Sequence, residues 1–310
     1  MNKSEKNGLS EFNFSSHTLN YRVILPERIN DRFFEIGKCF IPDLEESNNT
    51  KPIFTFIGSL GNPDFKLSKK TFQIISNGSL DNLCYETVKL ISKKIEEDYA
   101  NIGAISVHAA AVSNNGTGVL IMGPTHAGKS TLAMKSCLEN NFSYISGDRV
   151  LLKDTTIVGG TKSDTLRYAS FNRDLNLDFP IKIVDNLNLW SEQVVLDMSE
   201  YLKIESGQKN IEAIVFAQHH PSSSYFKELT DIAKKTIKLY DSLVFFLDTY
   251  PSLLYSAKTP LPPSKNDLLR EQRFNLAEKL SSFPCYSLVG TFSYMSGQIN
   301  SLLQGGSNTS

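Results

Sequence analysis

The fold of this chain is decided by residues 118–131, which read GVLIMGPTHAGKST. Residues 118–122 form an apolar run that is typical of a buried strand. The segment from Gly123 to Ser130 fits the pattern G-x-x-x-x-G-K-[ST], and residues 129–140 carry apolar side chains at helical spacing. The sequence therefore predicts a strand, a glycine-rich loop and a helix, in the order typical of a phosphate-binding loop.

The residue types of this loop suit a bound triphosphate with magnesium. Successive backbone N–H groups in a tight loop offer many donors to clustered negative charge, and glycine lets the backbone approach the phosphates. Lys129 is expected to reach the β- and γ-phosphates, Ser130 to place its hydroxyl on Mg²⁺, and Thr131 to contact the α-phosphate. The sequence thus predicts ATP and Mg²⁺ as ligands, in a cradle made of Gly123, Thr125, His126, Ala127, Gly128, Lys129, Ser130 and Thr131.

Composition and charge narrow the classes of function. Of the 310 residues, 40% are hydrophobic and 21% are charged, which favours a folded globular chain over a disordered one. The formal net charge of -1 gives no general attraction for nucleic acid, so no nucleic-acid partner is expected. The sequence has neither the apolar run of a secretory signal nor the run of about 18 residues that a membrane helix needs. We therefore expect a cytoplasmic protein without a membrane partner.

The sequence predicts a β-rich amino-terminal subdomain at residues 1–80, a core at 81–304 and a flexible tail at 305–310. The polar stretch up to about Ser16 has no sustained period and is predicted to be a disordered leader. After it, turn residues separate β-rich runs, which predicts a small antiparallel sheet with strands at residues 19–25, 33–41, 53–57 and 71–75.

The core alternates between strand and helix patterns, which predicts an α/β fold with a mixed sheet. Residues 104–112 and 118–122, joined by a turn that ends at Gly116, predict a hairpin that leads directly into the loop. Further strands are expected at residues 142–145, 150–153, 211–216 and 286–289, and helices at 81–99, 129–140, 222–249, 265–282 and 294–303.

Three segments in close succession carry a family resemblance: VHAAAV at residues 107–112, the strand and loop at 118–131, and ISGDRV at 145–150. Together they resemble the HPr kinase/phosphorylase-like P-loop family, which is related to ATP-dependent phosphoenolpyruvate carboxykinase. His108 matches the family's histidine before the loop, and Asp148 matches the second of its two adjacent aspartates. The resemblance implies a P-loop kinase core of the HPr kinase/phosphoenolpyruvate carboxykinase type, with Mg²⁺ held by Ser130 and Asp148.

The catalytic residues expected from this comparison are His108, Lys129, Asp148 and Arg149. Arg149 is the best cationic candidate for stabilising the transferring phosphoryl group, ahead of Lys153, Lys162 and Arg167.

One position departs from the family pattern. Gly147 stands where the family has its first aspartate, which serves as the base toward the acceptor hydroxyl. The base is then Asp148, His108 or a group brought by the acceptor, because phosphoryl transfer depends more on position and charge neutralisation than on full proton removal.

Two functions follow from these features. The first is an ATP-dependent kinase that transfers the γ-phosphate to a hydroxyl of a protein or peptide serine or of a small biosynthetic intermediate. The second is a nucleotide-binding switch or scaffold with little or no transfer, which Gly147 permits. The substitution Gly147→Asp distinguishes them, since a gain of transfer would indicate a competent site that lacks only its base. Because relatives in this family are often oligomeric, a homo-oligomer is a further expectation.

Overall fold

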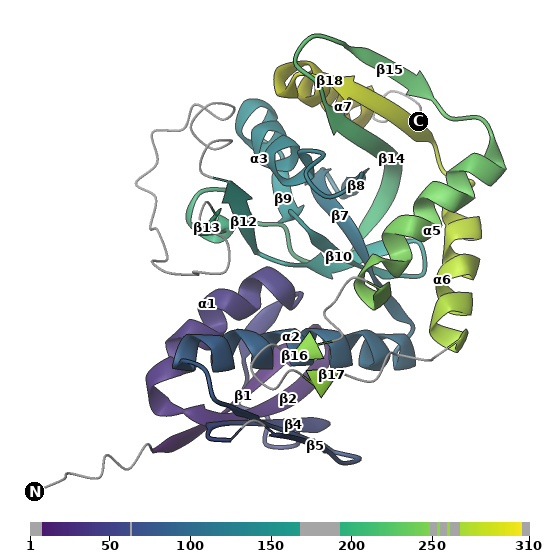
Figure 1. The fold of residues 1–310 in the computed structure, drawn as a ribbon. Helices are drawn as coiled ribbons and strands as arrows, with labels where there is room; N and C mark the ends of the chain where they lie inside the picture. Colours follow the sequence, from purple (N-terminus) through teal and green to yellow (C-terminus); the bar gives the residue numbers. More distant parts are fainter. Residues whose placement is uncertain are drawn as a thin grey trace, which may run out of the picture. The chain divides into compact units, whose positions relative to one another are not determined.

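The computed structural model describes residues 8–62, 64–167, 193–248, 253–254, 259–260 and 267–305. They form an α/β chain with mixed sheets (Figure 1). Two compact units are present. One comprises residues 8–95 with the short strands β16 (Leu253–Leu254) and β17 (Thr259–Pro260), and the other comprises 96–248 with 267–305. Of the predicted tail at 305–310, Gly305 ends helix α7 (Phe292–Gly305), and residues 306–310 lie outside the described residues.

The first unit is built on a six-stranded sheet with strand order β3-β1-β2-β4-β6-β5. Strands β1 and β2 are antiparallel, whereas β2–β4 and β4–β6 are parallel, so the prediction of an antiparallel sheet was wrong. The strands are β1 (Leu9–Ser16), β2 (Leu19–Pro26), β3 (Leu44–Glu46), β4 (Phe54–Leu60), β5 (Asp64–Leu67) and β6 (Thr71–Ser76).

Two local predictions in this unit fail for physical reasons. Residues 9–16, predicted to be disordered, form β1, in which the Phe14 ring is fully buried and stacks on Tyr21. Residues 33–41, predicted to be a strand, lie mostly in helix α1 (Asn30–Phe40), which follows the 3-10 turn η1 (Glu27–Ile29). Phe33, Ile36 and Cys39 are buried at steps of three, which is a helical period.

Helix α2 (Leu80–Asn101) confirms the predicted helix at 81–99 and leads into the second unit. That unit contains an eight-stranded sheet with strand order β11-β10-β7-β8-β14-β18-β15, and β9 pairs with β7 off this path. The strands are β7 (Ala104–Asn114), β8 (Thr117–Met122), β9 (Ser143–Ser146), β10 (Arg149–Lys153), β11 (Thr156–Gly160), β14 (Lys209–His219), β15 (Tyr225–Glu228) and β18 (Cys285–Gly290). A separate pair joins β12 (Ser163–Arg167) to β13 (Gln193–Asp197), which the 3-10 turn η3 (Met198–Glu200) follows.

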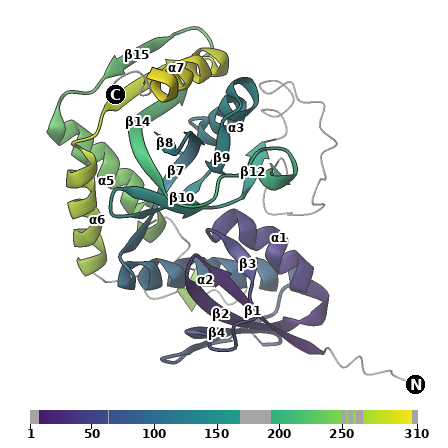
Figure 2. The same cartoon turned by 180° about the vertical axis from the view of Figure 1, so that it is seen from behind.

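Helices pack on both faces of this sheet. On one face, α3 (Lys129–Asn140) and α7 (Phe292–Gly305) share a core with alternate residues of β7, β8 and β14. On the other, α5 (Ile232–Asp248) and α6 (Asp267–Leu280) pack against the intervening residues (Figure 2). Alternate residues of each strand belong to different cores because successive side chains of a strand point to opposite faces of the sheet. The sheet is thus buried on both sides, as its long apolar strands predict.

Most core elements agree with the sequence prediction. The hairpin of β7 and β8, helix α3, strands β9, β10, β14 and β18, and helices α6 and α7 lie at the predicted places within a few residues. The predicted helix at 222–249 was wrong in part, because residues 225–228 pair with β18 as strand β15. Within the described part of the chain, no helix is long and apolar enough to cross a membrane.

Candidate functional site

The glycine-rich loop lies at the carboxyl ends of three neighbouring parallel strands. Strand β14 runs parallel to both β8 and β18, so the ends of all three meet at one edge of the sheet. The loop is tied to β14 there, because the His219 N–H donates to the Ala127 carbonyl oxygen at 3.0 Å. A Cβ added at Gly123 would lie 2.6 Å from the Ala217 carbonyl oxygen, so this position requires glycine. Crevices at the carboxyl edge of such sheets are common ligand sites.

Helix α3 begins at the end of the loop with its backbone donors uncapped. Gly128 precedes it in the left-handed region, and within the described residues no side chain caps this terminus. The first N–H groups of a helix have no intrahelical partner, and the helix dipole adds positive potential there. This terminus therefore offers hydrogen-bond donors to an anion.

Gly128 is confined by an aromatic stack. The His219 ring stacks on Phe292 with 4.3 Å between centroids, and a Cβ at Gly128 would lie 2.7 Å from the Phe292 Cε1 atom. Substitution at Gly128 must therefore shift this ring or the loop.

The substitution Gly128→Ala is expected to destabilise the protein by more than Gly116→Ala and, if the loop binds a nucleotide, to weaken that binding. Gly116 is the matched control, because its φ of 90° equals that of Gly128 at 89° within a degree while nothing lies within 4 Å of its Cβ position. The left-handed conformation alone costs about 1–2 kcal/mol for alanine. Urea unfolding and calorimetric titration with Mg·ATP measure the two effects. Equal losses of stability in both variants would contradict the predicted clash.

Lys129 lies in the first turn of α3, and its ammonium group folds over the loop. Its Nζ donates to the carbonyl oxygens of Gly123 at 3.1 Å and Pro124 at 3.2 Å. Burial lowers the pKa of Lys129 from its usual value, while the negative charges of Asp148 and Asp164 act in the opposite direction. Desolvation disfavours the charged form and nearby carboxylates favour it, so the effect of burial outweighs that of the two carboxylates on this ammonium group.

Ser130 connects the loop to the turn between β9 and β10. Its hydroxyl donates to the carbonyl oxygen of Gly147 at 2.8 Å, and Asp148 follows directly. On the other side, the His108 Nε2 atom lies 3.3 Å from Asp148 Oδ1, and the His108 ring stacks on Phe245 at 3.7 Å. The structure therefore brings Lys129, Ser130, Asp148 and His108 to one place, although they come from three separate segments, α3, the β9–β10 turn and β7.

The remaining cradle residues lie on the same loop. Thr125 and His126 are exposed at its tip, and His126 has a positive φ of 68°. Ala127 and Thr131 are buried, Thr131 in the first turn of α3.

Arg149 does not share the surroundings of the loop. It is fully buried, and its guanidinium pairs with Glu96, which also pairs with Arg273 at 2.6 Å. The Arg149 guanidinium also lies over the Phe246 ring, 4.3 Å from its centroid. These contacts hold the Arg149 side chain in the core, so we do not expect it to act on a phosphoryl group at the loop.

The structure also brings in a residue that no sequence motif indicates. Asp164 lies on β12 and is only 3% exposed, and its Oδ2 atom lies 3.4 Å from the Tyr144 hydroxyl. A Cβ built at Gly147 would lie 1.6 Å from that oxygen. The single substitution Gly147→Asp, which the sequence suggested as a test, therefore cannot separate a kinase from a nucleotide switch. The new side chain has no room while Asp164 stays in place.

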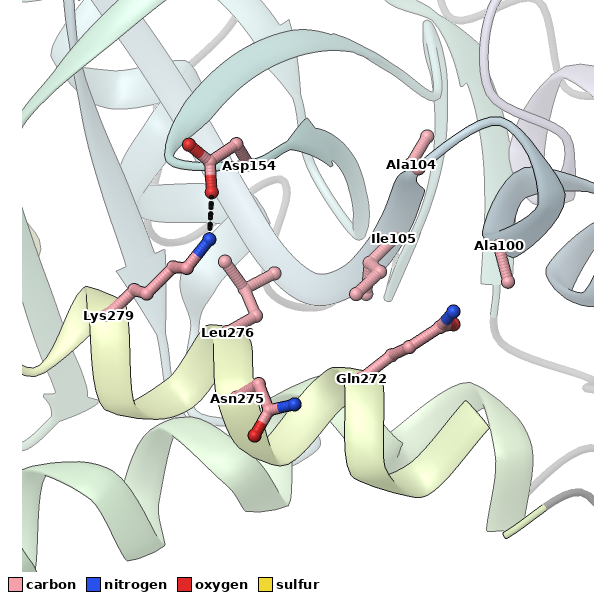
Figure 3. A pocket seen from close by; sticks show the side chains of 9 residues that line it. Ala100, Ala104, Ile105, Asp154, Gln272, Asn275, Leu276 and Lys279 are labelled. Atoms are coloured by element: carbon pink, nitrogen blue, oxygen red, sulfur yellow. Dashed lines mark hydrogen bonds and ion pairs between the residues drawn. The ribbon is translucent and has the colours of Figure 1, made fainter. Parts of the chain in front are cut away.

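The second unit also contains a cavity of about 240 Å³, which is lined by other residues than those of the loop (Figure 3). Its walls include Ile105, Leu276 and the exposed ion pair of Lys279 with Asp154, whose Nζ and Oδ1 atoms lie 2.8 Å apart. Among the described residues, none of those predicted for the site lines it. We therefore assign the candidate site to the loop.

A metal ion at the loop would have few protein ligands. Within the described residues, no three His, Cys, Asp or Glu side chains are grouped as a metal site. Mg²⁺ usually keeps several waters and binds one or two carboxylates together with substrate phosphates. Ser130 and Asp148 fit that sparse ligand set.

Comparison with protein-family models and with curated proteins gives no match. Among solved structures, the Hpr(Ser) kinase/phosphatase from Coxiella burnetii is similar, with a TM-score of 0.27 and 8% sequence identity. The match covers 65% of this chain and 95% of that one. A TM-score this low does not establish a shared fold.

Proposed function

We propose that this chain is an ATP-dependent kinase with a P-loop core, which transfers the γ-phosphate to a hydroxyl group. The main support for the proposal is that an ammonium group, a hydroxyl and a carboxylate lie together at the loop. Lys129 and Ser130 begin α3, and the Ser130 hydroxyl binds the carbonyl oxygen of Gly147, next to Asp148. An ammonium group, a hydroxyl and a carboxylate at an uncapped helix terminus are the groups that a magnesium-bound triphosphate requires.

Each group has one task in this proposal. The amides at the start of α3 and the Lys129 ammonium bind the phosphates, and the Ser130 hydroxyl and Asp148 carboxylate hold Mg²⁺. When bound, Mg²⁺ neutralises charge on the phosphate oxygens. His108 orients Asp148 through the 3.3 Å contact, and the stack on Phe245 fixes the imidazole plane.

The acceptor is a hydroxyl of a protein or peptide serine or of a small biosynthetic intermediate. Calorimetric titration with Mg·ATP, followed by incubation with γ-labelled ATP and a fractionated cell extract, tests the proposal. We expect saturable binding and labelled phosphate on an acceptor. Absence of Mg·ATP binding would contradict the kinase and the alternative nucleotide switch alike, whereas binding without any transfer would favour the switch.

The substitution Asp148→Asn is expected to raise the Mg²⁺ concentration needed for half-maximal ADP release by about 10- to 100-fold. The reason is that the amide lacks the negative charge of a metal-binding carboxylate. Glu139→Gln is the control, since Glu139 is an exposed carboxylate on α3 that pairs with Lys135. ADP release measured across a Mg²⁺ series gives the result, and an unchanged midpoint for Asp148→Asn would exclude its role at the metal.

A further inference from the structure

Asp164 is a second carboxylate beside the loop. Its charge and that of Asp148 both act on the Lys129 ammonium. The two carboxylates differ in exposure: the Asp148 side chain is 38% exposed, whereas Asp164 is 3% exposed. Asp164 is also held from the side by the Tyr144 hydroxyl, and Tyr144 is fully buried on β9. The Asp164 carboxyl group is therefore buried and held in position beside the candidate site.

Asp164 occupies the space that a side chain at residue 147 would fill. A Cβ at Gly147 would lie 1.6 Å from Asp164 Oδ2 and 2.6 Å from its Cγ, and 2.4 Å from the Tyr144 hydroxyl oxygen. These distances are far below van der Waals contact, so residue 147 must be glycine while Asp164 and Tyr144 hold their positions. Gly147 and Asp164 are therefore a matched pair, in which the Asp164 carboxylate of β12 occupies the space left by the missing side chain at residue 147.

The other polar groups at the site are linked by hydrogen bonds and ring contacts. Asp148 contacts His108, and the His108 ring is stacked on Phe245. The Ser130 hydroxyl donates to Gly147, the residue that Asp164 covers. Asp164 thus borders the loop through Gly147 and lies within electrostatic reach of Lys129, where the γ-phosphate would bind.

We propose that Asp164 is the carboxylate that accepts the proton of the acceptor hydroxyl. This inference rests on the proposed kinase function. In the step, the hydroxyl oxygen forms a bond to the γ-phosphorus while the bond from that phosphorus to the bridging oxygen breaks. The electron pair of the broken bond leaves on ADP, and the hydroxyl proton passes to the Asp164 carboxylate. A positioned base of this kind accelerates the reaction by taking up the proton in the transition state.

The first experiment compares Asp164→Asn with the wild type, using Mg·ATP as the probe and water as the acceptor. Single-turnover ADP release is expected to fall by about 100-fold or more, which is the lower range for loss of a general base. The dissociation constant for Mg·ATP, measured by calorimetry, is expected not to rise, because the lost negative charge does not hold the phosphates. Tyr144→Phe removes the hydroxyl contact to Asp164 and keeps the carboxylate. It is expected to slow ADP release by less than Asp164→Asn does, because the base remains but is held less firmly.

The second experiment moves the carboxylate to residue 147. Tyr144→Phe combined with Asp164→Ala removes both groups that lie within 2.6 Å of the Gly147 Cβ position. That double variant is expected to be slow, and adding Gly147→Asp to it is expected to restore at least about tenfold of the lost rate, within the range of a positioned base. In the otherwise wild-type protein, Gly147→Asp is expected to lower both stability and rate, because the new side chain meets Asp164.

Different outcomes separate this inference from the kinase proposal. If Asp164→Asn turns over at the wild-type rate while Lys129→Ala does not, the role of Asp164 is overturned and the kinase proposal stands. The same conclusion follows if Asp164→Asn unfolds and Gly147→Asp restores no rate to the double variant. If the wild-type protein neither binds nor turns over Mg·ATP, both proposals are overturned.

Discussion

Lys129→Ala is expected to lower γ-phosphate transfer by about 10²- to 10³-fold or more, as for removal of one preorganised donor to a developing charge. Lys129 is buried at the start of α3, and its ammonium lies on the loop carbonyls of Gly123 and Pro124. Its charge would therefore meet the β- and γ-phosphates directly, and no flexible surface lysine can replace it at that point. Transfer from γ-labelled ATP and calorimetric titration with Mg·ATP measure the loss.

Lys135→Ala is the matched control for this prediction. Lys135 lies on the same helix and pairs with Glu139 at 2.9 Å, two turns away from the loop end. We expect it to retain both binding and transfer. Retention of full transfer by Lys129→Ala, with a folded protein confirmed by circular dichroism, would contradict the assignment of the loop as the phosphate site.

Glu96→Gln is expected to destabilise the protein by about 3–5 kcal/mol, the usual cost of removing one partner from a buried ion pair. The Glu96 carboxylate pairs with both Arg149 and Arg273, and all three side chains are at most 2% exposed. Ser106 also donates to this carboxylate. The neutral amide would leave two buried guanidinium groups without a compensating charge. Denaturant unfolding followed by circular dichroism gives the free energy of unfolding.

The control for Glu96→Gln is Asp154→Asn. Asp154 pairs with Lys279 at 2.8 Å, but both side chains are more than 60% exposed. Exposed pairs contribute about 0–1 kcal/mol. Asparagine also tolerates the positive φ of 53° at this position. Similar losses for the two variants would show that the Glu96 network contributes no more than a surface pair.

The sequence was most informative where local pattern and chemistry coincide. The helix predicted at residues 129–140 has those bounds in the structure, because the loop pattern fixes its start and apolar spacing fixes its length. The hairpin before the loop was predicted for the same reason, since an Asn-Gly turn joins two apolar runs. His108 and Asp148 are in contact, as expected if both belong to one site.

The sequence was least informative where a residue's role depends on distant partners. Arg149 follows Asp148 directly and so resembles a site residue, yet strand alternation turns its side chain into the core toward Glu96. Asp164 lies in no motif, and its position depends on the pairing of β12 with β13 and on its contact with Tyr144. A glycine at residue 147 indicates nothing by itself. The alternation of Phe12 and Phe14 with polar residues was the missed signal for β1.

The two bonds from Lys129 to its own loop have a consequence for ligand choice. A ligand that recruits this ammonium group must outcompete the carbonyl oxygens of Gly123 and Pro124, which are already within hydrogen-bonding distance. A lone inorganic phosphate has only a few oxygens with which to compensate for that exchange, whereas a chain of three phosphates also engages the amides of α3. The hydrogen bonds of Lys129 to Gly123 and Pro124 thus favour a triphosphate over a single phosphate as the ligand of the loop. This preference does not depend on the base or the sugar of a nucleotide.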